Sequence, residues 1–360
     1  MEEKTALIGM SGGVDSSVAA YLMVRSGYRC IGATMRLYDN ETLGQSKERT
    51  CCSLDDVEDA RSVARRLGIP YYVFNFKEDF EKQVIEKFVD SYEQGRTPNP
   101  CIDCNRHLKF DRLLRRAQEL GYEYVVSGHY ARIRRDETTG RYLLYKAADR
   151  AKDQTYFLAC LSQEQLAHIQ FPLGGLTKPE VRQIAEENGF LNARKHDSQD
   201  ICFVPDGDYV RFLREFGGVT PEPGDFVDTS GRVLGRHRGL VAYTAGQRKG
   251  LGVSADRPLY VLSKDAKHNT VLLGDDAKLF SSALLASRVN WIITPPAEPL
   301  RVTAKTRYSQ RESAATVTPL DGGAVRVDFD EPQRAITAGQ AVVFYRGDVV
   351  AGGATIDKAL

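Results

Sequence analysis

Two cysteines stand three positions apart in TPNPCIDCNRHLKF, residues 97–110, between a Pro-Asn-Pro turn and a basic segment. Cysteines with this spacing occur in zinc ribbons, redox motifs and iron–sulfur sites. A four-thiolate zinc ribbon needs a second such pair, which the sequence lacks, so zinc is the weaker interpretation. We expect Cys104 at the N-terminus of a helix that begins at Asn105, where the helix dipole and basic neighbours favour the thiolate.

A further thiol of interest is Cys202 in HDSQDICFV, residues 196–204. The polar residues before Cys202 favour a loop, although a buried cysteine behind a surface loop explains the pattern about equally well. Seven cysteines, with neither a signal-peptide pattern nor an apolar run long enough to cross a bilayer, predict a cytoplasmic protein that has reduced thiols and no membrane contact.

The segment GMSGGVDSS, residues 9–17, follows an apolar run and opens a helical pattern. Glycines allow a tight turn, and the N-H groups at the start of a helix bind anions, so this loop is expected to hold phosphate. It has neither the Gly-Lys-Ser/Thr ending of a Walker A loop nor the Gly-x-Gly-x-x-Gly of a dinucleotide site. An ordinary Gly-Ser turn capped by Asp15 is the plainer alternative.

The elements that must position these residues alternate over residues 5–130 between short apolar runs and amphipathic helical segments. This rhythm predicts an α/β domain, residues 1–205, whose parallel sheet is covered on both faces and binds ligands at the carboxyl ends of its strands. A later helix of this domain is expected to be capped by Thr177. Residues 206–275 are expected to form a small β-rich domain, and residues 276–360 a β-barrel, because short strands alternate there with Pro, Gly and Asp turns.

The net charge of +1 excludes a strongly basic, histone-like protein, so any nucleic-acid surface must come from local clusters. One candidate is the helical face with Arg106, Lys109, Arg112 and Arg116, although a solvated helix face gives the same pattern. A second is RVTAKTRYSQR, residues 301–311, which contains no acidic residue and could instead be a solvated edge strand.

Seven motifs in order resemble those of the bacterial tRNA-specific 2-thiouridylases, a family of PP-loop ATP pyrophosphatases. They are SGGVDSS (11–17), MRLY (35–38), TPNPCIDCNRHLKF (97–110), SGHYAR (127–132), KDQTYFL (152–158), DSQDICF (197–203) and GQRKGLG (246–252). The resemblance implies that ATP, with Mg²⁺, adenylates the C2 oxygen of the wobble uridine, position 34 of tRNA, which sulfur then replaces. It implies a nucleotide site formed by Gly9, Met10, Ser11, Gly12, Gly13, Val14, Asp15, Ser16, Met35 and Gly128.

By the same resemblance, Cys202 carries a persulfide received from a sulfur-relay protein or a cysteine desulfurase. Cys104 is then the partner thiol, which helps release the sulfur and can end in a disulfide with Cys202. Asn99, Pro100 and Cys101 match the segment that contacts the target base. One well-known form of this motif has an acid/base Asp where this chain has Cys101, which leaves that role to Asp103 or a water.

The resemblance also implies contacts with the anticodon stem-loop of tRNA by His129, Lys152, Asp153, Gln154, Arg307, Tyr308 and Gln340. Three alternatives stay open at this point. Cys101, Cys104 and Cys202 could ligate an iron–sulfur cluster that carries out the same thiolation. The chain could be another PP-loop synthetase that forms amides, or a non-catalytic RNA-binding redox sensor.

Overall fold

The computed structural model describes residues 3–38, 54–195, 201–204 and 206–360. Positions 197–200 of the DSQDICF motif lie outside the described residues. Along this part of the chain, no helix is long and apolar enough to cross a membrane.

A five-stranded parallel sheet forms the centre of the first domain, with the strand order β3-β2-β1-β4-β7. Alternate residues of β1 face opposite sides, so Leu7 enters one apolar core while Ala6 and Ile8 enter another. This two-sided burial explains why the strands read as continuous apolar runs. The strands are β1 (Thr5–Gly9), β2 (Arg29–Arg36), β3 (Tyr71–Asn75), β4 (Tyr124–Val126) and β7 (Ile169–Gln170).

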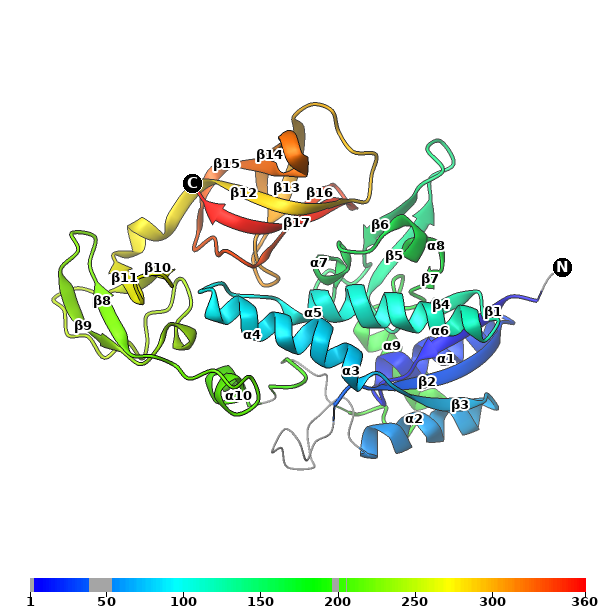
Figure 1. The fold of residues 1–360 in the computed structure, drawn as a ribbon. Coiled ribbons are helices and arrows are strands. Elements are labelled where there is room, and N and C mark those ends of the chain that lie inside the picture. The colour runs from blue at the N-terminus through cyan, green and yellow to red at the C-terminus, as the bar shows by residue number, and fades with distance from the viewer. Residues whose placement is uncertain (1–2, 39–53, 196–200, 205) are drawn as a thin grey trace.

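Helices cover both faces of this sheet (Figure 1). On one face lie α1 (Val14–Arg25), α2 (Leu54–Leu67) and α9 (Lys178–Glu187). The other face is covered by η2 (Cys104–Arg112), α6 (Leu113–Glu119), α7 (Thr155–Leu158) and α8 (Gln163–Ala167). The expected cap is confirmed, since Thr177 caps α9 and exchanges hydrogen bonds with Glu180.

Two long helical segments run beside each other at the edge of the domain (Figure 1). The first joins α3 (Lys77–Phe80), the π-helical η1 (Glu81–Ile85) and α4 (Glu86–Glu93); the second joins α5 (Pro100–Asp103), η2 and α6. The expectation that the second segment begins at Asn105 was wrong. It begins at Pro100, which occupies its first turn behind Asn99, because proline lacks only an N-H that the first turn leaves unbonded anyway. Cys104 therefore lies one turn inside the helix.

After α10 (Tyr209–Glu215), the chain forms the small middle domain, a four-stranded sheet with the strand order β10-β11-β8-β9. Its core contains Phe226, Tyr243 and Val261. The elements are β8 (Gly224–Val227), β9 (Val233–His237), η3 (Leu240–Ala242), β10 (Tyr260–Asp265), β11 (Thr270–Gly274) and η4 (Asp276–Leu279).

The C-terminal part is an antiparallel barrel, β12-β15-β14-β13-β16-β17, which closes because β12 also pairs with β17. Its elements are β12 (Phe280–Trp291), β13 (Leu300–Lys305), β14 (Ser313–Pro319), η5 (Asp321–Gly323), β15 (Val325–Arg334), β16 (Ala341–Arg346) and β17 (Val349–Ala359). A hairpin of the first domain, β5 (Ala131–Arg135) and β6 (Tyr142–Lys146), joins this sheet where Tyr145 pairs with Val349.

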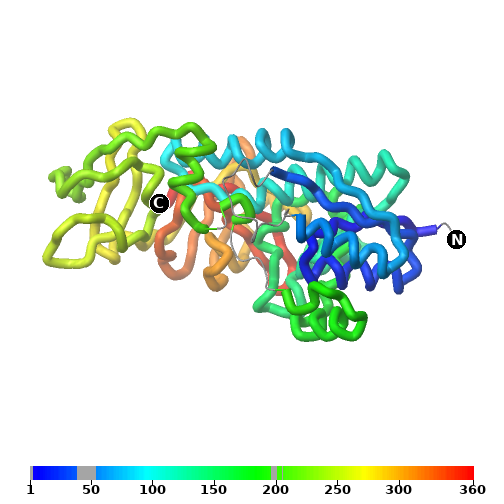
Figure 2. Tube along the Cα trace, turned by 90° about the horizontal axis from the view of Figure 1, so that it is seen from below, coloured from blue at the N-terminus to red at the C-terminus, as the bar shows by residue number. Residues whose placement is uncertain are grey.

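The barrel lies between the other two parts of an elongated molecule (Figure 2). It contributes Ile292, Val343 and Tyr345 to the core that also contains Leu7 of β1, so the barrel and the parallel sheet share one apolar core. An α/β domain followed by two β-rich domains confirms the predicted fold class. The boundaries at residues 205 and 275 stay a prediction.

Candidate active site

The loop between β1 and α1 is held at the carboxyl end of β1 by hydrogen bonds within itself and to β2. The N-H of Met10 donates to the carbonyl of Ala33 at 2.8 Å. Ser16 lies at the centre of the turn: its Oγ accepts from the Ser11 N-H at 3.2 Å and donates to the Gly13 carbonyl at 3.0 Å. The loop is therefore folded around the start of α1, where N-H groups without helical partners attract anions.

Two glycines permit this geometry. Gly12 has a φ of 73°, and a Cβ there would come within 2.4 Å of the Asp56 carbonyl oxygen. Gly128, beyond β4, approaches the start of α1 so closely that a Cβ would lie 2.7 Å from the Asp15 carbonyl carbon. Both predicted nucleotide-site positions therefore require glycine, because a side chain would push the helix start away from its neighbours.

An ion pair fixes the first turn of α1 from behind. Lys178 of α9, only 7% exposed, donates its ammonium to both carboxylate oxygens of Asp15 at 2.7 and 2.8 Å, and the Tyr130 hydroxyl donates to the same carboxylate at 2.8 Å. The predicted site residue Asp15 therefore positions the loop through these partners. Sequence reasoning missed Lys178, whose only signal was its place in the first turn of a capped helix.

Asn192 is a second residue that sequence reasoning missed. Its buried side-chain amide donates to the Gly12 carbonyl at 2.8 Å and to the Ser17 hydroxyl at 2.9 Å. It lies after α9, at the end of a segment that the motifs do not cover. Met35, at the carboxyl end of β2, is half-buried and packs against two of the apolar cores.

Cys104 and Cys202 lie in one apolar cluster, although they are far apart in the sequence. Cys104 is buried among Phe80, Leu108 and Phe203, and the half-buried Cys202 packs against the same cluster. The Tyr38 hydroxyl, just beyond β2, donates to the Cys202 carbonyl at 2.7 Å. Leu37 and Tyr38 of this cluster directly follow β2, and the loop 9–17 follows β1. Because β1 and β2 are parallel neighbours, the thiol cluster and the loop lie at the same edge of the sheet.

The other described cysteines differ from this pair. Burial raises the pKa of the Cys30 and Cys160 thiols to about 11, which keeps both protonated and unreactive at neutral pH. Cys101 is exposed on α5, whereas Cys104, the first residue of η2, is buried. Among the described residues, no group of three or more His, Cys, Asp and Glu side chains is arranged to hold a metal ion.

Asp103 lies between Cys101 and Cys104 in an unusual electrostatic setting. Burial raises the pKa of its carboxyl group, against the opposing effect of Lys87, Arg106 and Arg288. His107, one turn further along, shares a hydrogen bond of 3.1 Å with Lys87, and burial together with Lys87 lowers the pKa of His107 to about 4. The Asp103 carboxyl group is therefore easier to protonate than that of an exposed aspartate.

The structure directs several of the predicted tRNA contacts inward. Asp153 accepts hydrogen bonds from the Ala147 N-H and the Thr155 hydroxyl, and Gln154 accepts from the Tyr130 N-H at 2.9 Å. His129 packs between Phe110 and Phe171, and burial lowers its pKa well below the ordinary value.

Tyr308, in contrast, is 39% exposed and packs against Phe157 with a centroid separation of 4.4 Å. Lys305 lies over its ring, so an aromatic surface flanked by a cation is available for a nucleobase. Ion pairs partly neutralise the two basic segments that were candidates for nucleic-acid binding. Arg112 of the helical face pairs with Asp79, and Arg301 of residues 301–311 pairs with Asp330.

Arg307 and Gln340 join parts of the molecule. Arg307 donates to the carbonyls of Ala245 and Ala335 at 3.2 and 3.0 Å and to the Thr337 hydroxyl at 2.8 Å. The Gln340 amide donates to the Thr97 and Pro98 carbonyls at 3.0 and 3.2 Å, directly before the predicted base-contacting segment. The three domains therefore meet beside Asn99, Pro100 and Cys101.

Comparisons with known proteins agree with this layout. The family described as "tRNA methyl transferase HUP domain" matches residues 4–206, "tRNA methyl transferase PRC-barrel domain" matches residues 211–275, and "Aminomethyltransferase beta-barrel domain" matches residues 281–356. The chain is 53% identical to the tRNA-specific 2-thiouridylase MnmA of Acetivibrio thermocellus, over 99% of this chain and 100% of the relative. The chain belongs to the family of tRNA-specific 2-thiouridylases.

Other 2-thiouridylases are nearly as similar. The MnmA of Clostridioides difficile is 51% identical over 99% of both chains, and that of Clostridium perfringens is 48% identical over 100% of both. The family membership confirms the resemblance that the seven motifs indicated. Because the match covers nearly the whole length of this chain and of these 2-thiouridylases, its range includes all three domains.

Proposed function

We propose that this protein catalyses the ATP-dependent 2-thiolation of uridine 34 in tRNA, with sulfur delivered as a persulfide on Cys202. The observation that carries the proposal is the single apolar cluster that holds Cys104 and Cys202 at the sheet edge of the phosphate loop. Activation of an oxygen and its replacement by sulfur require these two sets of groups in one place. The reaction belongs in the cytoplasm, where we expect the protein to act.

The loop 9–17 is the proposed site for the phosphates of ATP. The backbone at Gly12 and Gly13 and the start of α1 supply N-H groups, and Met35 and Gly128 border the same edge. ATP supplies the activation, because transfer of its AMP part to the uridine O2 makes that oxygen a leaving group. Mg²⁺ is proposed to bind chiefly through the ATP phosphates, in keeping with its use of few protein ligands.

The proposed thiol chemistry has two substitutions. The terminal sulfur of the Cys202 persulfide attacks C2 of the activated uridine, and AMP departs with the former O2. The Cys104 thiolate then attacks Sγ of Cys202, which breaks the sulfur–sulfur bond, releases 2-thiouridine and leaves a Cys104–Cys202 disulfide. A thiol reductant must reduce this disulfide before a sulfur-relay protein or a cysteine desulfurase restores the persulfide.

Asp103 is the proposed proton carrier in place of the carboxylate that other forms of the motif have at position 101. Its raised pKa keeps a fraction of the carboxyl group protonated nearer neutral pH than an ordinary aspartate. Cys101, exposed on the same helical turn, is left as a contact to the target base.

The iron–sulfur alternative is less well supported by the described geometry. Cys101 is exposed and Cys104 is buried, and the described residues contain no three-ligand group suited to a metal ion. Three thiolates around one cluster would need a rearrangement of α5. The persulfide route needs only that Cys104 and Cys202 meet.

The decisive experiment is thiolation of an unmodified tRNA with uridine at position 34, with ATP and a persulfide-bearing donor protein, for the wild type and single Ala variants of Cys101, Cys104, Cys202 and Cys160. We expect Cys104→Ala and Cys202→Ala to lose at least about 100-fold in thiolation while pyrophosphate release continues. Cys160→Ala is the matched control and should keep its activity. Full activity of Cys202→Ala would overturn the mechanism, and pyrophosphate release with a small amine but no tRNA would indicate another PP-loop synthetase.

A further inference from the structure

The sequence Thr-Ala-Gly-Gln occurs twice, at 244–247 in the middle domain and at 337–340 in the barrel, and both copies adopt the same turn. Gly246 and Gly339 have φ values of 87° and 90°. In each copy the glycine N-H donates to the carbonyl of a strand residue, whose own N-H donates to the carbonyl of the glutamine that follows. That strand residue is Val261 for the first copy and Ile356 for the second. The two β-rich domains therefore present matching turns.

Arg307 joins the two turns, since its guanidinium reaches Ala245 of the first and Thr337 of the second. The second turn in turn holds the base-contacting loop: the Thr97 N-H donates to the Ala338 carbonyl at 3.0 Å, and Gln340 donates back to Thr97. This chain of hydrogen bonds fixes the start of GQRKGLG, residues 246–252, close to the segment that contacts the target uridine.

From this anchored start, the GQRKGLG loop carries two adjacent cations into solvent. Arg248 and Lys249 are both exposed, and within the described part of the chain neither pairs with a carboxylate. Arg257 differs, because it is bound to Asp275 at 2.8 Å. Gly250 and Gly252, with φ values of 77° and 67°, follow the two cations and turn the backbone back on itself.

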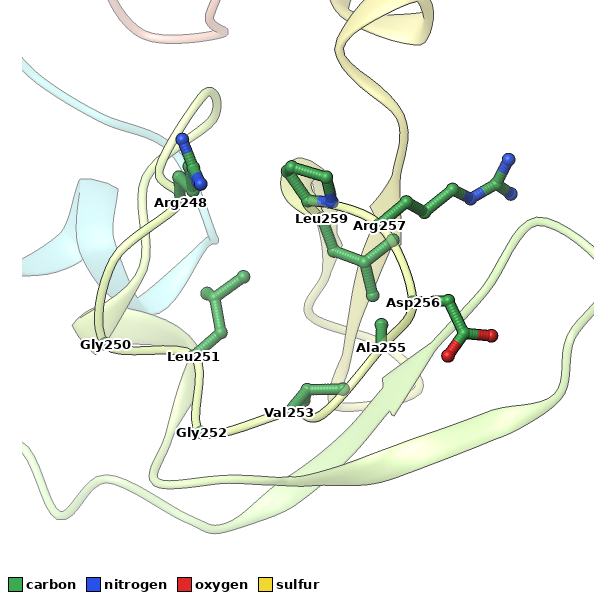
Figure 3. A pocket seen from close by; sticks show the side chains of 10 residues that line it. Arg248, Gly250, Leu251, Gly252, Val253, Ala255, Asp256, Arg257 and Leu259 are labelled. Atoms are coloured by element: carbon green, nitrogen blue, oxygen red, sulfur yellow. The ribbon is translucent and has the colours of Figure 1, made fainter.

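The loop encloses a hollow of about 420 Å³, which is wide open to solvent (Figure 3). Arg248 rises from one arm, and Asp256 and Arg257 on the opposite arm point away from it. The hollow is therefore bordered by a cation on the side of the anchored turn. Its polar lining and open form suit a solvated, charged group better than an apolar ligand.

We propose that Arg248 and Lys249 bind backbone phosphates of the tRNA next to the anticodon loop, while the target uridine occupies the TPNPC segment. The inference rests on the proposed function and adds a contact surface to it. An exposed cation pair is ordinarily only solvated. What distinguishes this pair is the rigid connection through Arg307 and Gln340 to the base-contacting loop, which sets one fixed register between a phosphate and the reacting base.

The test compares Arg248→Ala/Lys249→Ala with a control that removes the same charge, Arg236→Ala/Lys267→Ala, at the far end of the same sheet. Arg236 pairs with Asp225 between β8 and β9, and Lys267 lies in the turn between β10 and β11. Both are at the end of the sheet opposite Val261, which binds the turn at 244–247. We measure the dissociation constant of an unmodified tRNA with uridine 34 between 50 and 300 mM salt. The loop variant should bind about 10-fold more weakly near 100 mM salt, with a salt slope smaller by about 2.

Thiolation is measured with two donors, the persulfide-bearing protein and inorganic sulfide, whose HS⁻ can attack the activated C2 directly and displace AMP without a persulfide. We expect the loop variant to show a raised KM for tRNA at unchanged kcat, and the control to match the wild type. If the wild type does not thiolate tRNA with the protein donor, the proposed function fails. If the wild type is active but the loop and control variants bind tRNA equally well, the inference is overturned. A defect that occurs only with a protein donor would assign the loop to that donor instead and would also overturn it.

Discussion

At the scale of single residues, the fold of the phosphate loop depends on which of its positions have no room for a Cβ. Gly12 and Gly13 are neighbours in the same motif, but only Gly12 has a positive φ, 73°, and a backbone oxygen in the space that a Cβ needs. Gly13 has a φ of −87° and would meet nothing closer than the Ser11 hydroxyl at 3.5 Å. The two glycines therefore have different physical reasons to be present.

We predict that Gly12→Ala destabilises the protein by about 2 kcal/mol or more and abolishes ATP-dependent pyrophosphate release, because the loop must move away from Asp56. Gly13→Ala should cost less than about 1 kcal/mol, since its backbone conformation is open to any residue. Urea unfolding and a pyrophosphate assay check both. Equal losses in the two variants would show that the positive φ of Gly12 is not the controlling feature.

At the scale of elements, polar side chains connect the helices, and the sequence does not show which of these side chains are partners. The alternation of strands and helices was predictable from apolar periodicity, and so was the helix cap at Thr177. The partnership of Lys178 with Asp15 was not, because it depends on α9 lying beside α1 in space. The start of the helix at Pro100 was also missed, since Cys101 to Asp103 give no helical signal of their own.

The ion pair between α1 and α9 gives a prediction at this scale. Lys178→Met leaves the Asp15 carboxylate partly buried with Tyr130 as its one side-chain partner among the described residues, so we expect a loss of about 3 kcal/mol in the free energy of unfolding. Arg194→Ala breaks an exposed ion pair with Glu186, which like Lys178 belongs to α9, and should cost less than about 0.5 kcal/mol. Urea denaturation of both variants measures the contrast, which would vanish if the α1–α9 pair contributed no more than a surface pair.

At the scale of the whole molecule, the middle domain meets the first domain through a lysine whose ammonium group is buried. The ammonium of Lys264 in β10 has no hydrogen-bond partner among the described residues, and it lies 5.6 Å from the centre of the Tyr92 ring at the end of α4. Burial lowers the pKa of Lys264 to about 8. This contact therefore joins two domains at an electrostatic cost.

We predict that Lys264→Met stabilises the protein at pH 7 by about 1 kcal/mol, because it removes the desolvated charge and keeps the apolar stem. In the wild type, the folded state loses its proton near pH 8 and the unfolded state only near pH 10.5, so stability rises with pH between these values. The variant should lack this rise. Urea unfolding at pH 7 and pH 10 measures it, with the exposed Lys267→Met as control, and an identical rise in the variant and the wild type would contradict the prediction.

The arrangement of the domains also shows what the motifs could and could not predict. The family resemblance predicts that Cys104 and Cys202 act together, and in the fold both belong to one apolar cluster. The joining of three domains at Thr97 and Pro98 could not be predicted, since Arg307 and Gln340 meet their partners only through the packing of the barrel on the first domain.

The hairpin β5–β6 has a consequence for synthesis on the ribosome. Its strand β6 pairs with β17 at Tyr145 and Val349, so the first domain emerges from the ribosome with this edge of β6 unpaired while about 200 later residues are still to be translated. During that time Tyr145 of β6 lacks the strand partner that Val349 provides in the complete fold. We therefore infer that the first domain reaches its final form only after translation of the barrel, and that a ribosome stalled before β17 would hold a nascent chain prone to aggregation.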